Sequence, residues 1–378
     1  MGFTTEIFLF IFLPVTILAC MFVPGKLLNF CVLLLSAAFY LSAGMETAVV
    51  FAAFILISYM FGCLIEKAKK YNRALMVCAV GVAVLFLTYY KYLVFLRDNL
   101  NQLSGGALHL TFSPATAAPL GISFLVFSAI SYFSDVYMGG GTADSLLNVA
   151  LYIAFFPKLL SGPIARWKDF APQTASAWAK RNLVGGINRI ILGYTKKAVI
   201  ADSLGLTIAE FNNRVPAGVD APSYWLNALF YMFQLYYDFS GYSDIAIGLG
   251  MLFGFELPEN FRQPYTSASI TEFWRRWHIS LGAWFREYVY IPLGGNRRGN
   301  VYVHLFVVFL LTGIWHGANW TFVLWGLLHG LFVILERFLN RSGKLEKIPA
   351  VCRWPVTMLV VYFSWVLFMS PSIQAALA

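Results

Sequence analysis

Apolar residues along the chain form long runs, and short polar or basic connections separate them. Each run is close to the roughly 20 residues that a helix needs to cross the hydrocarbon core of a membrane. The pattern therefore predicts an all-α polytopic membrane protein with on the order of ten spanning segments. The clearest runs cover about residues 5–23, 27–43, 47–65, 74–96, 116–138, 301–317, 319–338 and 353–369.

Helix-breaking residues interrupt this pattern in the middle of the chain. Two prolines and a glycine lie close together in FFPKLLSGPIARW, residues 155–167, which predicts a short or broken helix. Residues 222–255 form another apolar run, but Asp238 and Asp244 lie within it. At 3.6 residues per turn these carboxylates would point about 240° apart, so we expect a bend or a re-entrant segment near Gly241. Irregular backbone at membrane depth persists only where it is buried in protein or lines a cavity, which makes Asp238 a candidate for the substrate path.

The basic connections predict the orientation of the chain, because cytoplasmic loops of membrane proteins carry an excess of lysine and arginine. Residues 66–73 (EKAKKYNR) and 337–353 are expected on the cytoplasmic side, and residues 97–115 and the N-terminus outside. The basic, amphipathic stretch 165–197 predicts helices that lie on the cytoplasmic surface. No basic region precedes the first apolar run, so we expect a retained first helix rather than a signal peptide.

Composition strengthens the membrane assignment and excludes several classes of function. Of the 378 residues, 59% are hydrophobic and 12% are charged, whereas about a quarter of a soluble domain is charged. The net charge of +9 comes from short loops, so positive-inside topology and contact with anionic membrane lipid explain it, and no nucleic-acid partner is expected. The five cysteines are scattered without metal spacing, so neither a redox role nor a metal site is expected.

One histidine lies where an ionisable group is costly. His316 falls near the middle of the apolar stretch from about 301 to 334, and ionisable residues at membrane depth usually face a cavity or pathway. A neutral imidazole there could act as a general base that takes a proton from a hydroxyl as it attacks an acyl carbonyl. Trp315 adjoins it as a candidate lining residue, and Asn319 could orient it or stabilise an oxyanion. A structural histidine bonded to a neighbouring helix is the alternative.

A second histidine, His278, lies in the longest polar region of the chain, close to two arginines. Arg275 and Arg276 would lower the pKa of His278 and could hold an anionic carrier or headgroup. Packing at the membrane interface is the alternative role for His278. Glu272 and Arg276 are four residues apart on a predicted helix, so this pair could be structural.

Signatures of other enzyme classes are absent from the sequence. It contains no GxSxG, no phosphate-binding loop and no zinc spacing. Direct acyl transfer with one histidine as base is therefore simpler to propose than a covalent enzyme intermediate, and it needs no bound cofactor. Two other classes stay open: a transporter of an acyl carrier or polymer, which broken helices with buried aspartates would suit, and a scaffold for a secretion complex. Internal symmetry would favour a transporter, and none is visible; a scaffold predicts that substitutions of His316 are silent.

Three long segments of the sequence stand out together: YYDFSGYSDIAIGLG, PENFRQPYTSASITEFWRRWHISLGAWFREYVYIPLGGNRRGN and LLTGIWHGANWTFVLWGLLHG. They closely resemble the membrane-bound O-acyltransferase (MBOAT) family, in its bacterial branch of alginate O-acetyltransferase-like proteins. PLGISFLVFSAISYFSDVY and FFPKLLSGPIARW are also similar to the family, and the resemblance covers roughly residues 5–372. Relatives that acetylate peptidoglycan carry very similar motifs, so the acceptor polymer is left open.

The resemblance implies a fold, a site and a reaction. The fold would be a ring of about ten tilted or broken helices around a thin floor with a tunnel, whose cytoplasmic and outer funnels meet at His316. His316 would be the catalytic histidine of the family, and His278 its second signature histidine. The enzyme would pass acetyl from a cytoplasmic thioester such as acetyl-CoA to a hydroxyl of a cell-surface, alginate-like polysaccharide or of a partner transferase. Peptidoglycan or another cell-wall polymer is the alternative acceptor.

The resemblance also implies a location and a domain organisation. We expect a multi-pass protein of the bacterial cytoplasmic (inner) membrane that serves exopolysaccharide biosynthesis. A single integral membrane domain would cover residues 1–378, with N-terminal helices at 5–96, a catalytic core at 116–338 and a last span at 353–369. Relatives usually continue through further helices after a segment like SWVLFMSPS, so this chain is expected to be shortened or to use a partner there.

Overall fold

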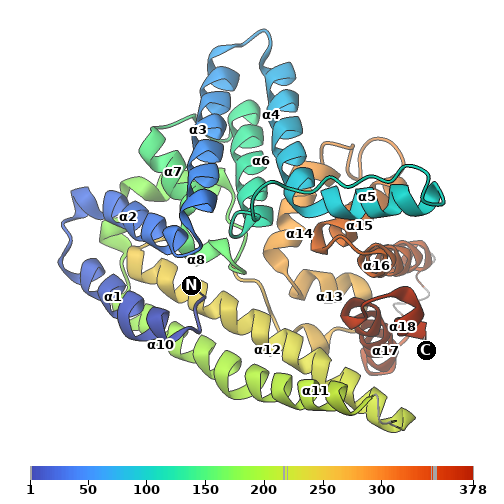
Figure 1. Cartoon of the computed structure of the whole chain (residues 1–378). Helices are drawn as coiled ribbons and strands as arrows, with labels where there is room; N and C mark the ends of the chain where they lie inside the picture. The colour runs from blue at the N-terminus through green and yellow to red at the C-terminus, as the bar shows by residue number, and fades with distance from the viewer. Residues whose placement is uncertain (1, 216–217, 219, 342, 344–346, 378) are drawn as a thin grey trace. The chain divides into compact units, whose positions relative to one another are not determined.

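The regular structure of the protein is helical. The computed structural model describes residues 2–215, 218, 220–341, 343 and 347–377, and no strand occurs among them (Figure 1). This confirms the predicted all-α class. Within the described part, 4 helices are long and apolar enough to cross a membrane, namely Met45–Lys67, Asn72–Leu103, Trp320–Asn340 and Ala350–Met369. Shorter apolar helices cover Phe8–Phe22, Gly25–Leu41, Ile122–Met138 and Val301–His316.

The chain divides into two compact units. The first comprises Met1–Gly193 and Tyr242–Pro258. Its helices α3, α4 and α6 pack side by side, and a Cβ on Gly62 would lie 2.0 Å from the Tyr132 hydroxyl oxygen (Figure 1). Its helices are α1 (Leu13–Phe22), α2 (Leu28–Leu41), α3 (Met45–Lys67), α4 (Asn72–Leu87), α5 (Leu93–Leu103), α6 (Ile122–Met138), α7 (Leu146–Ala154), α8 (Phe156–Leu159), α9 (Trp167–Phe170) and α10 (Leu183–Tyr194).

The predicted break at the prolines of the first unit is confirmed. Helix α7 ends at Ala154, α8 forms one short turn, and the chain is then irregular as far as Arg166. The break is buried, as irregular backbone in such a protein must be. Lys158 within it has a side chain that donates to Ser128 Oγ at 3.0 Å and lies over the ring of Tyr152, 3.6 Å from its centroid.

The second unit comprises Tyr194–Gly241 and Glu259–Ala378, and it contains both histidines that the sequence singled out. Its core is built largely from aromatic side chains, among them Phe273, Trp277, Trp325 and Trp365. The packing of so many large rings is what fixes the short helices of this unit relative to the long ones. Its helices are α11 (Asp202–Arg214), α13 (Ile270–Arg276), α14 (Ile279–Phe285), α15 (Val301–His316), α16 (Trp320–Asn340), α17 (Ala350–Met369) and α18 (Ile373–Leu377).

The bend expected near Gly241 does not occur. Helix α12 (Ala221–Phe253) runs without interruption for 33 residues through both aspartates. Each carboxylate pairs with a different cation instead: Asp238 pairs with Lys197 at 2.8 Å, a lysine that also pairs with Asp202, and Asp244 pairs with Arg189 at 2.7 Å. Two opposite-facing carboxylates therefore need no backbone break when each is neutralised on its own side of the helix.

Candidate active site

His316 is the last residue of α15. The chain turns at the extended Gly317, and α16 begins after Asn319, whose Oδ1 accepts from the Thr321 N–H at 3.1 Å as its cap. The half-buried imidazole of His316 is walled by aromatic edges, with the Trp325 and Phe368 centroids at 5.0 and 5.2 Å. A titratable ring at a helix end, beside a turn of small residues, can reach a substrate that an interior helical residue could not.

Glycines let α15 and α16 approach each other backbone to backbone (Figure 1). A Cβ on Gly313 would lie 2.4 Å from the Phe322 carbonyl oxygen, and one on Gly326 would lie 2.5 Å from that of Phe309. Small residues at membrane helix interfaces permit this close contact. The hairpin therefore holds His316 at a fixed position relative to α16.

His278 lies in the break between α13 and α14. Its backbone is left-handed, with φ 45°, a conformation that is uncommon for a residue with a side chain and that recurs at functional sites. The ring is buried, and its Nε2 has no hydrogen-bond partner among the described residues. This residue lies outside the apolar spans, and burial lowers the pKa of His278 well below its ordinary value; the charge of His316 lowers it further. The two histidines are therefore electrostatic neighbours, and His278 is neutral at physiological pH.

Helix α13, which leads into His278, is tied to α16 at two points. The Glu336 carboxylate accepts from the backbone N–H groups of Ile270 and Thr271 at 2.5 and 2.8 Å and from the Thr271 hydroxyl at 2.7 Å. Trp274 Nε1 donates to His329 Nδ1 at 3.3 Å. A carboxylate at a helix N-terminus satisfies N–H groups that have no partner within the helix. These bonds hold the short helix that carries Arg275 and Arg276.

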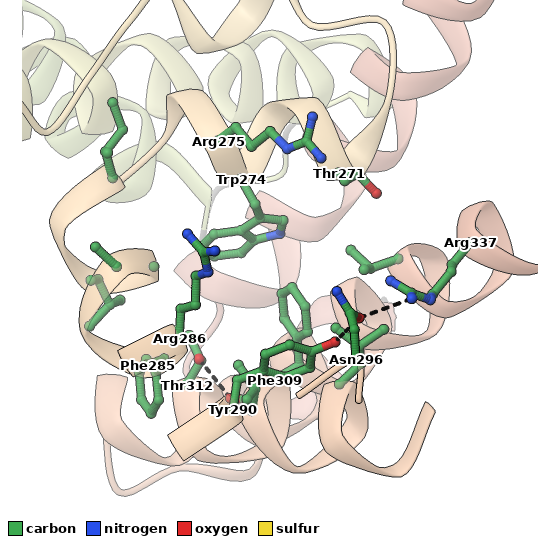
Figure 2. Close-up of a pocket in the computed structure, with 17 residues that line it drawn as sticks. Thr271, Trp274, Arg275, Phe285, Arg286, Tyr290, Asn296, Phe309, Thr312 and Arg337 are labelled. Atoms are coloured by element: carbon green, nitrogen blue, oxygen red, sulfur yellow. Dashed lines mark hydrogen bonds between the residues drawn. The ribbon is translucent and has the colours of Figure 1, made fainter. Parts of the chain in front are cut away.

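A cavity of about 610 Å³ opens beside α13, and three arginines line it (Figure 2). The guanidinium groups of Arg275 and Arg286 have no hydrogen-bond or ion-pair partner among the described residues, and Arg337 donates to Asn296 Oδ1 at 3.0 Å. Tyr290 donates its hydroxyl to the same oxygen at 2.7 Å. None of the described residues that line the cavity is acidic. The arrangement suits an anionic ligand, because guanidinium groups bind phosphate or carboxylate oxygens through paired hydrogen bonds.

The apolar wall of this cavity follows one face of α15 toward His316. Leu305, Val308, Phe309 and Thr312 line it, at the three- and four-residue spacing of a single helix face. Thr312 lies one helical turn before His316 on that helix. A ligand with a charged end at the arginines could therefore extend an apolar or uncharged arm along α15 in the direction of the histidine.

Comparison with known proteins identifies the group of enzymes to which this arrangement belongs. The model of the membrane-bound O-acyltransferase family matches residues 136–378, which include both histidines and the whole cavity. The chain belongs to the membrane-bound O-acyltransferase family. It is an O-acyltransferase, and the predicted enzyme class is confirmed.

Relatives of this acyltransferase place it in the predicted bacterial branch. It is 40% identical over 386 residues to a Pseudomonas putida protein named a probable alginate O-acetylase, covering 100% of this chain and 79% of that protein. It is 33% identical over 418 residues to the peptidoglycan O-acetyltransferase of Helicobacter pylori, covering 99% and 78%. It is 32% identical over 268 residues to the teichoic acid D-alanyltransferase of Bacillus subtilis, covering 66% and 67%.

The residues predicted for the site of this acyltransferase fall into three groups. His316 and His278 come together in the second unit, with Trp315 between them at 4.9 and 6.1 Å between ring centroids. Arg275 lines the cavity. The roles of all of these stay predictions.

The remaining candidates are bound to other groups. Arg276 pairs with Glu272 at 2.7 Å, as its spacing predicted. Asn319 donates its amide to the Pro371 carbonyl at 2.8 Å while it caps α16, and Asp238 pairs with Lys197. The roles proposed for Asn319, Asp238 and Arg276 at the site also stay predictions.

Sequence reasoning missed Arg286, Arg337, Tyr290 and Asn296, which share the cavity with Arg275. Arg286, Tyr290 and Asn296 lie in the same polar region as Arg275, and only Arg337 is distant in sequence. Of these residues, Arg286 carried a signal, as an arginine in the same aromatic-rich segment as His278.

Proposed function

We propose that this acyltransferase transfers acetyl from a cytoplasmic thioester to a hydroxyl of a cell-surface polysaccharide. Three findings support the proposal: the relatives named as alginate O-acetylases, the pair of histidines and the basic cavity that leads toward His316. An alginate-like polymer, or a partner transferase that modifies it, is the first candidate acceptor. The protein would lie in the bacterial inner membrane as a multi-pass protein, with the donor on one side and the acceptor on the other.

The single observation that carries the mechanism is the position of His316 at a helix end beside His278. In the proposed reaction the acceptor hydroxyl oxygen attacks the thioester carbonyl carbon while His316 takes the hydroxyl proton. A tetrahedral oxyanion forms, and its collapse breaks the carbon–sulfur bond and yields the ester. The imidazolium of His316 returns the proton to the departing thiolate, so no covalent enzyme intermediate is needed.

The basic cavity supports the donor side of this reaction. A thioester carried on phosphopantetheine combines phosphate charge with an uncharged arm that ends in the acyl group. Arg275, Arg286 and Arg337 would bind the phosphate, and the α15 wall would guide the arm toward His316. Acetyl-CoA and an acylated carrier protein both have this chemistry.

The test is the acetate that mild alkali releases from surface polymer. Cells with the wild-type chain should yield ester-linked acetate, and cells with His316→Ala or without the protein should yield none above background. Loss of the general base alone costs about 10²–10⁴-fold in rate. Normal acetylation by a folded, membrane-inserted His316→Ala protein would refute the assignment of the base.

A second acceptor has a specific observation in its favour. The Helicobacter pylori relative acts on peptidoglycan and is 33% identical over 99% of this chain. The same assay decides between the two polymers if the polysaccharide and the peptidoglycan are separated before alkali treatment. Acetate confined to the peptidoglycan fraction would move the assignment to the cell wall.

A further inference from the structure

The loop that presents His278 is organised by one buried asparagine, Asn260, from earlier in the same polar segment. Asn260 is fully buried, and its Oδ1 accepts from the Ser280 hydroxyl at 2.5 Å and from the Ser280 N–H at 3.3 Å. The same oxygen lies 3.4 Å from His278 Nδ1. The backbone carbonyl of Asn260 accepts from the Ile279 N–H at 3.0 Å. One residue thus contacts three consecutive residues of the break between α13 and α14.

These contacts fix the identity of the atoms involved. A backbone N–H can only donate, so the side-chain atom of Asn260 that faces Ser280 is the oxygen and not the amide nitrogen. An acceptor oxygen opposite His278 Nδ1 favours the tautomer in which Nδ1 carries the proton. The lone pair of the ring then lies on Nε2, and the partner of one ring nitrogen decides the chemistry of the other.

Nothing among the described residues occupies that lone pair. Nε2 of His278 is buried without a hydrogen-bond partner, although buried polar atoms in folded proteins nearly always have one. The Phe239 ring lies perpendicular to the imidazole, at 4.7 Å between centroids. A phenyl ring has no N–H or O–H group, so it does not supply the missing donor. His316 on α15 is the titratable group whose charge acts on His278. Of the two arginines shortly before His278 in the sequence, Arg276 is paired with Glu272.

We infer that Asn260 is a positioning residue for acyl transfer: it holds His278 in the Nδ1–H tautomer, so that Nε2 stays a bare acceptor. This rests on the proposed function. The bare, buried Nε2 can then accept a hydrogen bond from a group that enters the site during transfer, such as the acceptor hydroxyl. Asn260 forms and breaks no covalent bond during transfer, and it neither gains nor loses a proton.

The test compares two substitutions at this position with one elsewhere. Asn260→Asp keeps an acceptor oxygen in the same place, whereas Asn260→Leu has a similar size and no acceptor. Asn227→Leu, at another buried asparagine of the same unit, controls for the loss of a buried amide. Each variant is expressed as the full chain in cells that make the polymer. Alkali-labile acetate is measured against time, and thermal unfolding of the purified protein in detergent is measured in parallel.

The expected result is a loss of about 10²-fold in the rate of Asn260→Leu, while Asn260→Asp keeps a tenth or more of the wild-type rate and Asn227→Leu is close to wild type. If the role of Asn260 were purely structural, the transfer rates of Asn260→Asp and Asn260→Leu would fall in proportion to their loss of thermal stability. Wild-type transfer by folded Asn260→Leu overturns the inference. If Asn260→Leu does not fold, a folded but inactive Asn260→Asp overturns it. Absence of ester from the wild type would instead refute the proposed function.

Discussion

Two arginines at the cavity carry charge that no carboxylate in the described part of the chain neutralises. The guanidinium groups of Arg275 and Arg286, at the lining of the cavity, have no partner among the described residues, so a ligand phosphate is the group that would pair with them. We expect Arg275→Gln and Arg286→Gln each to raise the apparent KM for acetyl-CoA about tenfold. A charge-assisted hydrogen bond contributes about 1.5–3 kcal/mol, and 1.4 kcal/mol corresponds to a factor of ten. The measurement is acetyl transfer in isolated membranes with acetyl-CoA as the added donor.

The control for these variants is Arg297→Gln. Arg297 is exposed in the neighbouring glycine-rich loop and does not line the cavity. The KM of the Arg297→Gln enzyme for acetyl-CoA should therefore match that of the wild type. The same experiment at higher salt should raise the wild-type KM and narrow its difference from the two cavity variants, because salt screens exposed charges. A change in kcat with an unaltered KM in the cavity variants would contradict a role in donor binding.

At the scale of single residues, the sequence predicted those residues that are unusual within their own segment. His316 could be singled out because an ionisable group in an apolar run is costly, and the Glu272–Arg276 pair because helical spacing sets it. Asn260 could not be found in this way, because an asparagine in a polar segment is ordinary. Its importance comes only from its contacts with three consecutive residues of the loop between α13 and α14.

Among the elements, α13 depends most on its neighbours. It has only 7 residues, which is too short to be stable alone in water, and the Glu336 carboxylate caps its first turn with three hydrogen bonds. We expect Glu336→Ala to destabilise the protein by about 1–3 kcal/mol, because it leaves these donors unsatisfied. The acyl-transfer rate should fall as well, since α13 carries the backbone into His278. Thermal unfolding in detergent and the acetate assay measure the two effects.

Glu336→Gln is the matched variant for this helix cap. Its amide oxygen can still accept from the N–H groups, so its stability should lie between those of the wild type and Glu336→Ala. Equal stability of Glu336→Ala and the wild type would show that the cap contributes nothing to α13.

The elements themselves were largely predictable, and the failure at α12 has a clear cause. Apolar runs located α2, α3, α6, α15, α16 and α17 to within a few residues, because spanning length and hydrophobicity are local properties. The continuity of α12 depends instead on Lys197 and Arg189, which neutralise its two aspartates from other parts of the chain. A pattern within one segment contains no information about such partners.

At the scale of the whole molecule, the hairpin of α15 and α16 relates the cavity to the two sides of the membrane. Asn296, just before α15, bonds to Arg337, near the end of α16, so Arg337 lies at the end of the hairpin away from His316. The segment that follows α16 is one of the basic connections expected in the cytoplasm. Arg337 would therefore meet a cytoplasmic donor, about 24 Å along α15 from the histidine at 1.5 Å per residue.

This orientation can be measured with single cysteines in a variant whose five native cysteines are replaced. Cysteine at Arg297 or Lys69 should react with a membrane-impermeant maleimide only after spheroplasts are lysed, whereas cysteine at Gly105 should react in intact spheroplasts. The reason is that positively charged connections are retained on the cytoplasmic side during insertion, and the loop around Gly105 lies in the segment predicted outside. Labelling at position 297 in intact spheroplasts would place the arginine cavity outside the cell. A cytoplasmic thioester could not then enter by that route, and the cavity would have to be assigned to the polymer instead.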